Sequence, residues 1–268
     1  MSATDTWSGD DYARHSSLQE AMAAEVLSLL QLRGDEQVLD VGCGDGRLSA
    51  RVAAMLPRGQ VLGVDASPDM VAHAQRQFDA QAHANLRFEV ADARTLGFGP
   101  RFDLVLSFNA LHWVAQPAQQ ADALRGIANA LKPHGQAHIR LVTRGALASL
   151  EETAEAVRRE ADWTGDFSGF SDPYLRLDAD AYAALAAESG LRVRSHHSAM
   201  KRWDFGSEEA FFGFCNAGFG AWTQRLPAAR RRAFVEQVMR RYGALIEAAF
   251  GERHTFHFMQ TDLLLERA

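Results

Sequence analysis

The residues best suited to chemistry in this sequence are three glycines and the acidic residues around them. Gly42, Gly44 and Gly46 follow the apolar run 37–41, and Asp65 ends the next apolar run. Glycines between a strand and a helix let the backbone turn sharply and let a ligand approach the helix N-terminus. An acidic residue at the end of the second strand can accept hydrogen bonds from both hydroxyls of a ribose. The pattern therefore predicts a nucleoside-binding loop.

The charge of this loop narrows the choice of nucleoside. Asp40 precedes the glycines and Asp45 lies among them, and carboxylates there would repel a pyrophosphate but favour a ligand with an ammonium and a sulfonium group. The glycine spacing also differs from the Gly-x-Gly-x-x-Gly of dinucleotide-binding loops. We therefore expect S-adenosylmethionine; a nicotinamide oxidoreductase, or plain turn glycines with surface acids, are the alternatives. Cys43 is expected to fill space in the loop rather than to react.

The apolar periodicity predicts the elements that must position this loop. Short apolar runs alternate with helical segments through the first half of the chain, which is typical of βαβ units in a parallel sheet. The second half is less regular and richer in helical spacing. Strands are predicted at 37–41, 60–64, 86–90, 102–108, 137–142, 191–200 and 255–265, and helices at 10–32, 46–55, 68–78, 117–131, 146–160 and 179–189, with two more within 207–250.

Five segments in order resemble the motifs of class I S-adenosylmethionine-dependent methyltransferases, and they are 38–46, 62–67, 90–93, 102–108 and 131–135. One mild departure is His134, where the family usually carries glycine. The resemblance implies an α/β fold with a doubly wound, mostly parallel seven-stranded Rossmann-like sheet, a reversed last strand and extra helices. It also implies a bound S-adenosylmethionine held by Asp40, Gly42, Cys43, Gly44, Asp65, Ala66, Met70, Asp92, Ala93, Phe108 and Asn109.

The segment after the fourth predicted strand indicates the class of substrate. It lacks the Asn/Asp-Pro-Pro-aromatic motif of methyltransferases that act on nucleobase amino groups. The tripeptide 111–113 instead resembles small-acid carboxyl methyltransferases of the trans-aconitate and juvenile-hormone-acid type, and Tyr12 and Gln19 share one face of a predicted helix. The resemblance implies that Gln19 and Trp113, both neutral donors, hold the substrate carboxylate, with Tyr12 beside them. Ordinary packing of Trp113 and a solvated helix face are the alternatives.

Gln19, His112 and Trp113 are therefore the candidate catalytic residues. We expect O-methylation of a carboxylate on a partly hydrophobic small acid, and this nucleophile is ionised at neutral pH and needs no base. His112 is best interpreted as a hydrogen-bonded wall residue, but for N-, C- or phenolic O-methylation it becomes the first candidate base. A catalytically silent ligand-binding protein on this fold is the non-enzyme alternative.

An aromatic stretch at 211–222 supplies the remaining candidate substrate-binding residues. Phe211, Phe214, Phe219 and Trp222 lie in it together with three glycines, and helices of a pure core rarely tolerate so much glycine. The stretch is expected to cover an apolar substrate pocket, which would favour a substrate with a sizeable hydrophobic part. Plain core packing is the alternative.

The whole chain is expected to be a single methyltransferase domain, because no linker-like segment separates its halves. Its expected parts are an N-terminal helical cap (1–33), a cofactor-binding core (34–145), and helical insertions that form the substrate cover (146–190 and 203–252).

Composition sets the remaining expectations. The formal net charge of −6 argues against a nucleic-acid partner. Two cysteines make no disulfide framework, and no apolar stretch reaches transmembrane length, so a cytoplasmic protein with no membrane partner is expected. No histidine–cysteine cluster has metal-ligand spacing, so no metal is expected. The expected partner is a small-molecule substrate, with a homodimer left open.

Overall fold

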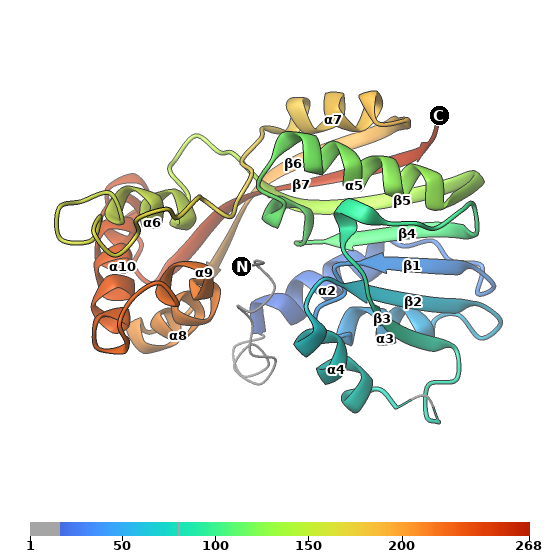
Figure 1. The fold of residues 1–268 in the computed structure, drawn as a ribbon, viewed down its shortest axis with the longest axis horizontal. Coiled ribbons are helices and arrows are strands. Elements are labelled where there is room, and N and C mark those ends of the chain that lie inside the picture. The colour runs from blue at the N-terminus through green and yellow to red at the C-terminus, as the bar shows by residue number, and fades with distance from the viewer. Residues whose placement is uncertain (1–16, 80) are drawn as a thin grey trace.

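Seven strands form one sheet in the computed structural model, which describes residues 17–79 and 81–268 (Figure 1). The strand order is β3-β2-β1-β4-β5-β7-β6. β7 is antiparallel to both of its neighbours, whereas the other pairs are parallel. The predicted doubly wound sheet with a reversed last strand is confirmed. The strands are β1 (Gln37–Val41), β2 (Gln60–Asp65), β3 (Leu86–Val90), β4 (Phe102–Phe108), β5 (Leu131–Thr143), β6 (Leu191–Asp204) and β7 (Thr255–Arg267).

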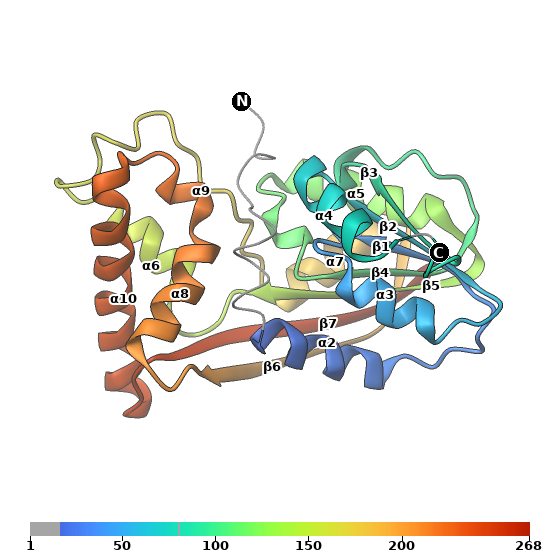
Figure 2. The same ribbon diagram turned by 90° about the horizontal axis from the view of Figure 1, so that it is seen from below.

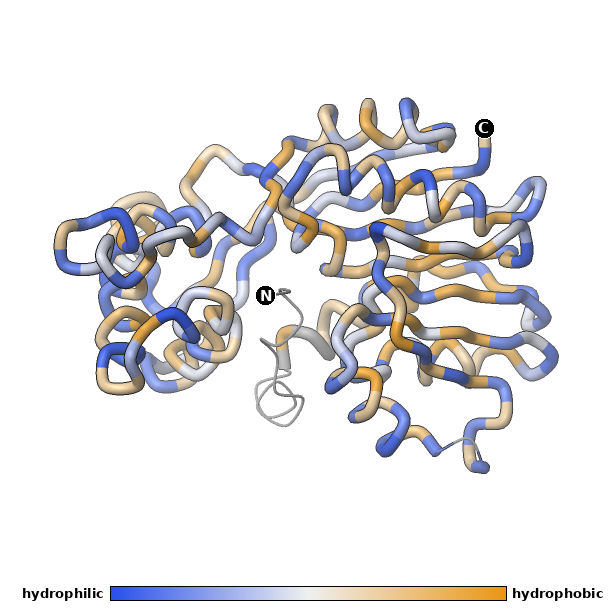
Figure 3. The backbone as a smooth tube through the Cα atoms, viewed as in Figure 1, coloured by the Kyte–Doolittle hydropathy of each residue, from blue (hydrophilic) through white to orange (hydrophobic). Residues whose placement is uncertain are grey.

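Helices cover both faces of this sheet, and the sheet's central strands are strongly apolar (Figure 3). One face packs against α5 and α7, and the other against α3 and α4 with the end of α2. Within the described part of the chain, no helix combines the length and apolar character needed to cross a membrane. The helices are α2 (Ser17–Leu29), α3 (Arg47–Ala54), α4 (Pro68–Gln77), η2 (Ala93–Thr95), η3 (Leu111–Trp113), α5 (Pro117–Ala130), α6 (Leu150–Val157), α7 (Ala179–Glu188), α8 (Glu208–Gly218), α9 (Gly220–Thr223) and α10 (Ala228–Phe250).

A separate group of helices, which we call the cover, stands beside the sheet at the ends of β6 and β7 (Figures 1 and 2). It consists of α6, the segment 158–178, and residues 207–250 with α8, α9 and α10. The cover has its own apolar core, which also takes in Phe256 and Phe258 of β7. The expected insertion 146–190 is corrected in one respect. Tyr182 and Ala186 of α7 pack in the core of the sheet rather than in the cover.

Local sequence signals explain several element boundaries. Ser67 accepts a hydrogen bond from the Met70 amide (3.3 Å) and is followed by Pro68, so α4 begins where a capping residue and a first-turn proline predict it. The region 207–250 holds three helices rather than the predicted two. β5 begins at Leu131, before the predicted strand, and passes through an irregularity where His134 adopts a left-handed φ of 68°.

Candidate functional site

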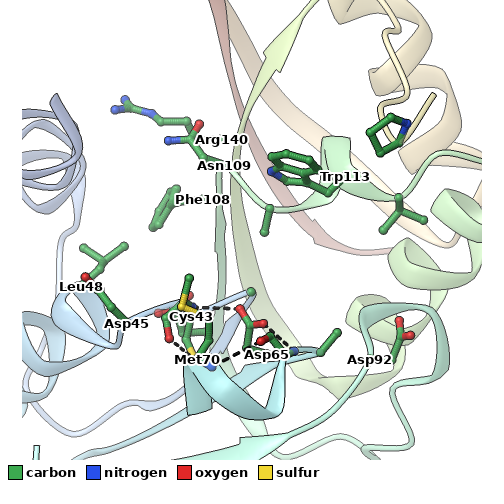
Figure 4. Close-up of a pocket in the computed structure, with 18 of the residues that line it drawn as sticks. Cys43, Asp45, Leu48, Asp65, Met70, Asp92, Phe108, Asn109, Trp113 and Arg140 are labelled. Atoms are coloured by element: carbon green, nitrogen blue, oxygen red, sulfur yellow. Dashed lines mark hydrogen bonds between the residues drawn. The ribbon is translucent and has the colours of Figure 1, made fainter. Parts of the chain in front are cut away.

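A cavity with a volume of about 1320 Å³ lies between the carboxyl ends of the central strands and the cover. Strands of an open α/β sheet bind ligands at this edge because loops and helix N-termini converge there. Residues from α2, from the loops after β1, β2, β3 and β4, and from the cover all line the cavity (Figure 4).

The glycine loop forms the floor of the cavity. Gly42 has a φ of 79°, and a Cβ placed there would lie 2.2 Å from the Cβ of Ala110. Gly44 also has a positive φ and lines the cavity. Glycine adopts this backbone without strain, and at Gly42 only glycine permits the close approach of the loops after β1 and β4. The predicted roles of Gly42 and Gly44 therefore have a direct structural basis.

Asp65 lies at the end of β2 against this loop. Its carboxylate accepts hydrogen bonds from the amides of Gly44 (3.0 Å) and Ser67 (2.9 Å), which fix its orientation (Figure 4). Burial raises the pKa of Asp65, and the two amides oppose that rise. A carboxylate held in this way retains lone pairs for two hydroxyl donors. Its geometry suits the two hydroxyls of a ribose.

Two more carboxylates make the loop negative. Asp40 is buried and accepts a hydrogen bond from the Ser49 hydroxyl at 2.6 Å, and burial raises its pKa to about 6. Asp45 pairs with Arg47 at 3.3 Å between Nε and Oδ2. Part of the predicted negative charge is therefore compensated by Arg47. Asp40 and Asp65 keep the site suited to a cationic nucleoside.

The other predicted cofactor residues fall into two groups. Asp92 lines the cavity, but its carboxylate already binds the backbone amide and the guanidinium of Arg94. Ala93 is corrected: it does not line the cavity, because it turns into η2 and packs against the sheet core. The residues that line the cavity as predicted also include Cys43, Ala66, Met70, Phe108 and Asn109.

Asn109, at the cavity wall, has two energetically unfavourable features. Its φ of 55° is left-handed, which non-glycine residues seldom adopt. Its side-chain Nδ2 contacts the Met22 sulfur at 3.7 Å, and its buried Oδ1 has no hydrogen-bond partner among the described residues. Such strain collects at ligand sites. The conformation supports the prediction that Asn109 is a binding residue.

His112 lies in a buried position that suits the interpretation as a hydrogen-bonded wall residue better than that as a base. It is 4% exposed, does not line the cavity, and stacks on Tyr174 with ring centroids 5.1 Å apart. Its Nδ1 accepts a long hydrogen bond from the Val142 amide (3.4 Å). Burial lowers the pKa of His112 to about 3, with Arg176 adding to the effect. The imidazole is therefore not part of the described cavity wall.

Trp113, by contrast, lines the cavity where the sequence placed it. Tyr174 packs behind it with ring centroids 4.2 Å apart, and Tyr174 in turn stacks on Trp222 of the cover. This aromatic stack connects the loop after β4 with the cover. It therefore fixes the Trp113 indole at the boundary between the two parts.

The aromatic stretch is placed differently from the prediction. Phe211, Phe219 and Trp222 are buried in the apolar core of the cover, Phe214 packs against that core, and none of them lines the cavity. The Trp222 indole donates a hydrogen bond to Glu155 at 2.8 Å. These side chains pack in the cover, which favours the packing alternative.

The N-terminal predictions are only partly open to description. Tyr12 lies outside the described residues. Gln19 belongs to α2, but its side chain is also outside what the structure describes. Other residues of α2, including Met22 and Val26, do line the cavity. The helix itself is thus part of the site.

Several cavity residues escaped the sequence analysis. Arg140 lies in β5 and is 1% exposed, with its guanidinium bound to Asp262 (2.8 and 2.9 Å) and to Glu25 (3.3 Å). An arginine inside a buried apolar strand was a signal that could have found it. No sequence signal marks the cover residues. The cover contributes Gly169, Phe170, Ser171, Asp172, Pro173, Ala221, Gln224 and Arg225.

Comparisons with known proteins agree with this geometry. Residues 38–135 match a methyltransferase domain family. Trans-aconitate 2-methyltransferase of Deinococcus radiodurans is 38% identical over 109 residues, covering 41% of this chain and 40% of the relative. The Escherichia coli enzyme of the same name is 23% identical over 245 residues, covering 91% and 90%. A Bacillus halodurans methyltransferase candidate has a similar structure, with a TM-score of 0.64, 16% identity and coverage of 91% and 98%.

The fold, the acidic glycine loop and the domain matched over residues 38–135 resemble those of class I S-adenosylmethionine-dependent methyltransferases. Among the relatives of this kind, the chain is similar to trans-aconitate 2-methyltransferases. The residues fit the cofactor: Asp65 would hold its ribose, and the glycine loop with Asp40 would accommodate its cationic part.

Proposed function

We propose that this methyltransferase O-methylates a carboxylate on a small, partly hydrophobic acid. When bound, S-adenosylmethionine supplies an activated methyl group on a positively charged sulfur. The cavity walls supply proximity, alignment and exclusion of water, which suffice for displacement of so good a leaving group.

One observation carries this proposal: apart from Asp40 and Asp65, which we assign to the cofactor, and three aspartates held by arginines, the described cavity wall offers no candidate general base. Among the described residues that line it, none is histidine, lysine, tyrosine or glutamate. Asp172 lies on the cover side, but its carboxylate binds the Arg176 guanidinium and the Tyr174 amide. A phenol, amine or carbon acid would need a base, whereas a carboxylate is already ionised at neutral pH.

The apolar part of the wall supports the second half of the proposal. Trp113, Val114 and Ala115 line the cavity from the sheet side, and Phe170 and Pro173 line it from the cover. These side chains favour an acceptor with hydrophobic carbon next to its acid group. We assign Trp113 to orienting the carboxylate. The trans-aconitate 2-methyltransferases among the relatives support an acid as the acceptor.

The test is a methyl-transfer screen with tritium-labelled S-adenosylmethionine over acids, phenols and amines. The products are then treated with mild alkali, which releases labelled methanol from esters but not from N-methyl, C-methyl or phenolic O-methyl products. Release of the label as methanol is the expected result. A stable labelled product would show that another atom is methylated.

Two variants test the roles of neighbouring side chains. His112→Gln should keep kcat and its pH profile within about twofold of the parent, because a residue outside the cavity moves no substrate proton. Trp113→Phe keeps the ring but removes the indole donor, and it should raise KM for the acid by roughly tenfold. A loss of kcat in the His112 variant, together with an altered pH profile, would show that His112 acts as a general base. That result would refute the assignment of a carboxylate as the methyl acceptor.

A further inference from the structure

We propose that Arg225 binds an oxyanion of the substrate remote from the methyl acceptor, so that this enzyme selects acids with a second, negatively charged end. The inference rests on the proposed function and adds a recognition point on the cover. It concerns the choice of substrate rather than the methyl transfer itself.

Arg225 lies two residues after the end of α9, which is on the side of the cover that faces the sheet (Figures 1 and 2). It lines the cavity together with Gln224 and Phe170. Its guanidinium carbon lies 5.6 Å from the centroid of the Phe170 ring. A guanidinium that rests on an aromatic face keeps its N–H donors directed outward, where an oxyanion could meet them.

The charges around the cavity distinguish Arg225 from the other arginines. Arg47, Arg94 and Arg140 each form an ion pair with an aspartate. Arg51 has no ion pair within the described residues, but it belongs to α3 on the cofactor side. Arg225 is the cation that the cover contributes to the described wall, and no described carboxylate pairs with it.

The carboxylate that the cover contributes does not cancel this charge. Asp172 is bound by Arg176, which is itself largely buried beside it. Ser171 and Gln224, two neutral polar residues, complete the polar part of the cover wall around Arg225. This face of the cavity is therefore positively biased, and an oxyanion is the complementary ligand.

The oxyanion must differ from the methyl acceptor. The cofactor loop lies at the strand ends with Asp65 and Asn109 (Figure 4). Arg225 lines the same cavity but belongs to the cover. An arginine at the reacting carboxylate would also stabilise its lone pairs and weaken the nucleophile. Carboxylates and phosphonates share the oxygen geometry that a guanidinium binds with two parallel hydrogen bonds, so either group could occupy this position.

The experiment compares three acids that share one methylatable carboxylate and differ only at the far end. Hexanedioic acid ends in a carboxylate, 5-phosphonopentanoic acid in a phosphonate, and hexanedioic acid monoamide in a neutral amide. Binding is measured by calorimetry with S-adenosylhomocysteine present, in the parent and in Arg225→Gln, Arg225→Lys and Arg240→Gln. Arg240 is the matched control, because it is an exposed arginine of α10 that does not line the cavity.

The parent should bind at least one oxyanion-ended acid about tenfold more tightly than the monoamide, and Arg225→Gln should abolish that preference. Arg225→Lys should retain part of it, and Arg240→Gln should match the parent. Whichever of the two oxyanion-ended acids binds more tightly relative to the monoamide identifies the preferred oxyanion as carboxylate or phosphonate. Equal binding of all three acids by the parent, absence of binding, or an equal loss for the monoamide in Arg225→Gln would overturn the inference.

Turnover of the same acids separates this inference from the proposed function. Arg225-dependent binding without ester formation would refute carboxyl methylation and leave the inference standing. Ester formation with no difference between the parent and Arg225→Gln would refute the inference and leave the proposed function standing.

Discussion

Replacing Asp40 with asparagine should stabilise the cofactor-free protein at neutral and higher pH. Asp40 is 2% exposed, and burial, the largest cause, raises its pKa from 3.8 to about 6, with the Asp65 carboxylate adding to the rise. The folded protein thus binds this proton more tightly than the unfolded chain. The stabilisation is fully present below about pH 4 and is lost as pH rises through about 6.

The size of the effect follows from the shift in pKa. Ionising Asp40 in the folded protein costs roughly 3 kcal/mol at pH 7.5, because each pKa unit corresponds to about 1.4 kcal/mol. Asparagine keeps an oxygen that can accept the hydrogen bond from Ser49 and carries no charge at any pH. Asp40→Asn should therefore gain up to about 3 kcal/mol over the parent at pH 7.5 and little at pH 4.

Urea unfolding at several pH values measures this difference directly. The gap between the free energies of unfolding of Asp40→Asn and the parent should open between pH 4 and pH 7. Asp45→Asn is the control, since Arg47 already pairs with the Asp45 carboxylate and no comparable gain is expected. A gap that stays constant across this range, or a variant that is less stable at pH 7.5, would refute the reasoning about burial.

Two further predictions concern the cover and the fifth strand. Phe219→Ala removes a ring that is 2% exposed in the core of the cover, so it should lower the free energy of unfolding in urea by about 3–5 kcal/mol. The ratio of KM values for hydrophobic and polar acids should stay unchanged. A selective rise in KM for hydrophobic acids would show that Phe219 contacts the substrate. His134→Gly should relieve the left-handed φ of 68° and raise the melting temperature by about 1–3 °C; a lower melting temperature would show that the imidazole makes contacts that outweigh the strain.

The cofactor half of the site could be predicted from the sequence because its signals are local. Gly42 and Asp65 stand at strand ends, and the parallel sheet brings those ends to one edge whatever the rest of the chain does. The strands of the first half are short and apolar, so their type was readable from periodicity. The boundaries of β5 and β6 were less accurate, because tertiary pairing extends both strands beyond their apolar cores.

The substrate half could not be predicted in the same way. A buried aromatic such as Trp222 has the same sequence signature in the core of the cover as on a pocket wall, and only the packing of α8, α9 and α10 decides between them. The exposure of His112 depended on Tyr174, a residue from a distant loop that stacks on it. No sequence pattern predicted that Arg225 lines the cavity, because its position depends on how the cover faces the sheet.

The most direct measurement for the whole account is calorimetric binding of S-adenosylmethionine to Asp65→Ala, with the exposed α4 residue Asp69→Ala as control. The Asp65 carboxylate should account for roughly a hundredfold of the affinity, the worth of two charge-assisted hydrogen bonds, while the control binds like the parent. If the Asp65 variant remains folded and binds the nucleoside as tightly as the parent does, the assignment of this loop to the cofactor is wrong.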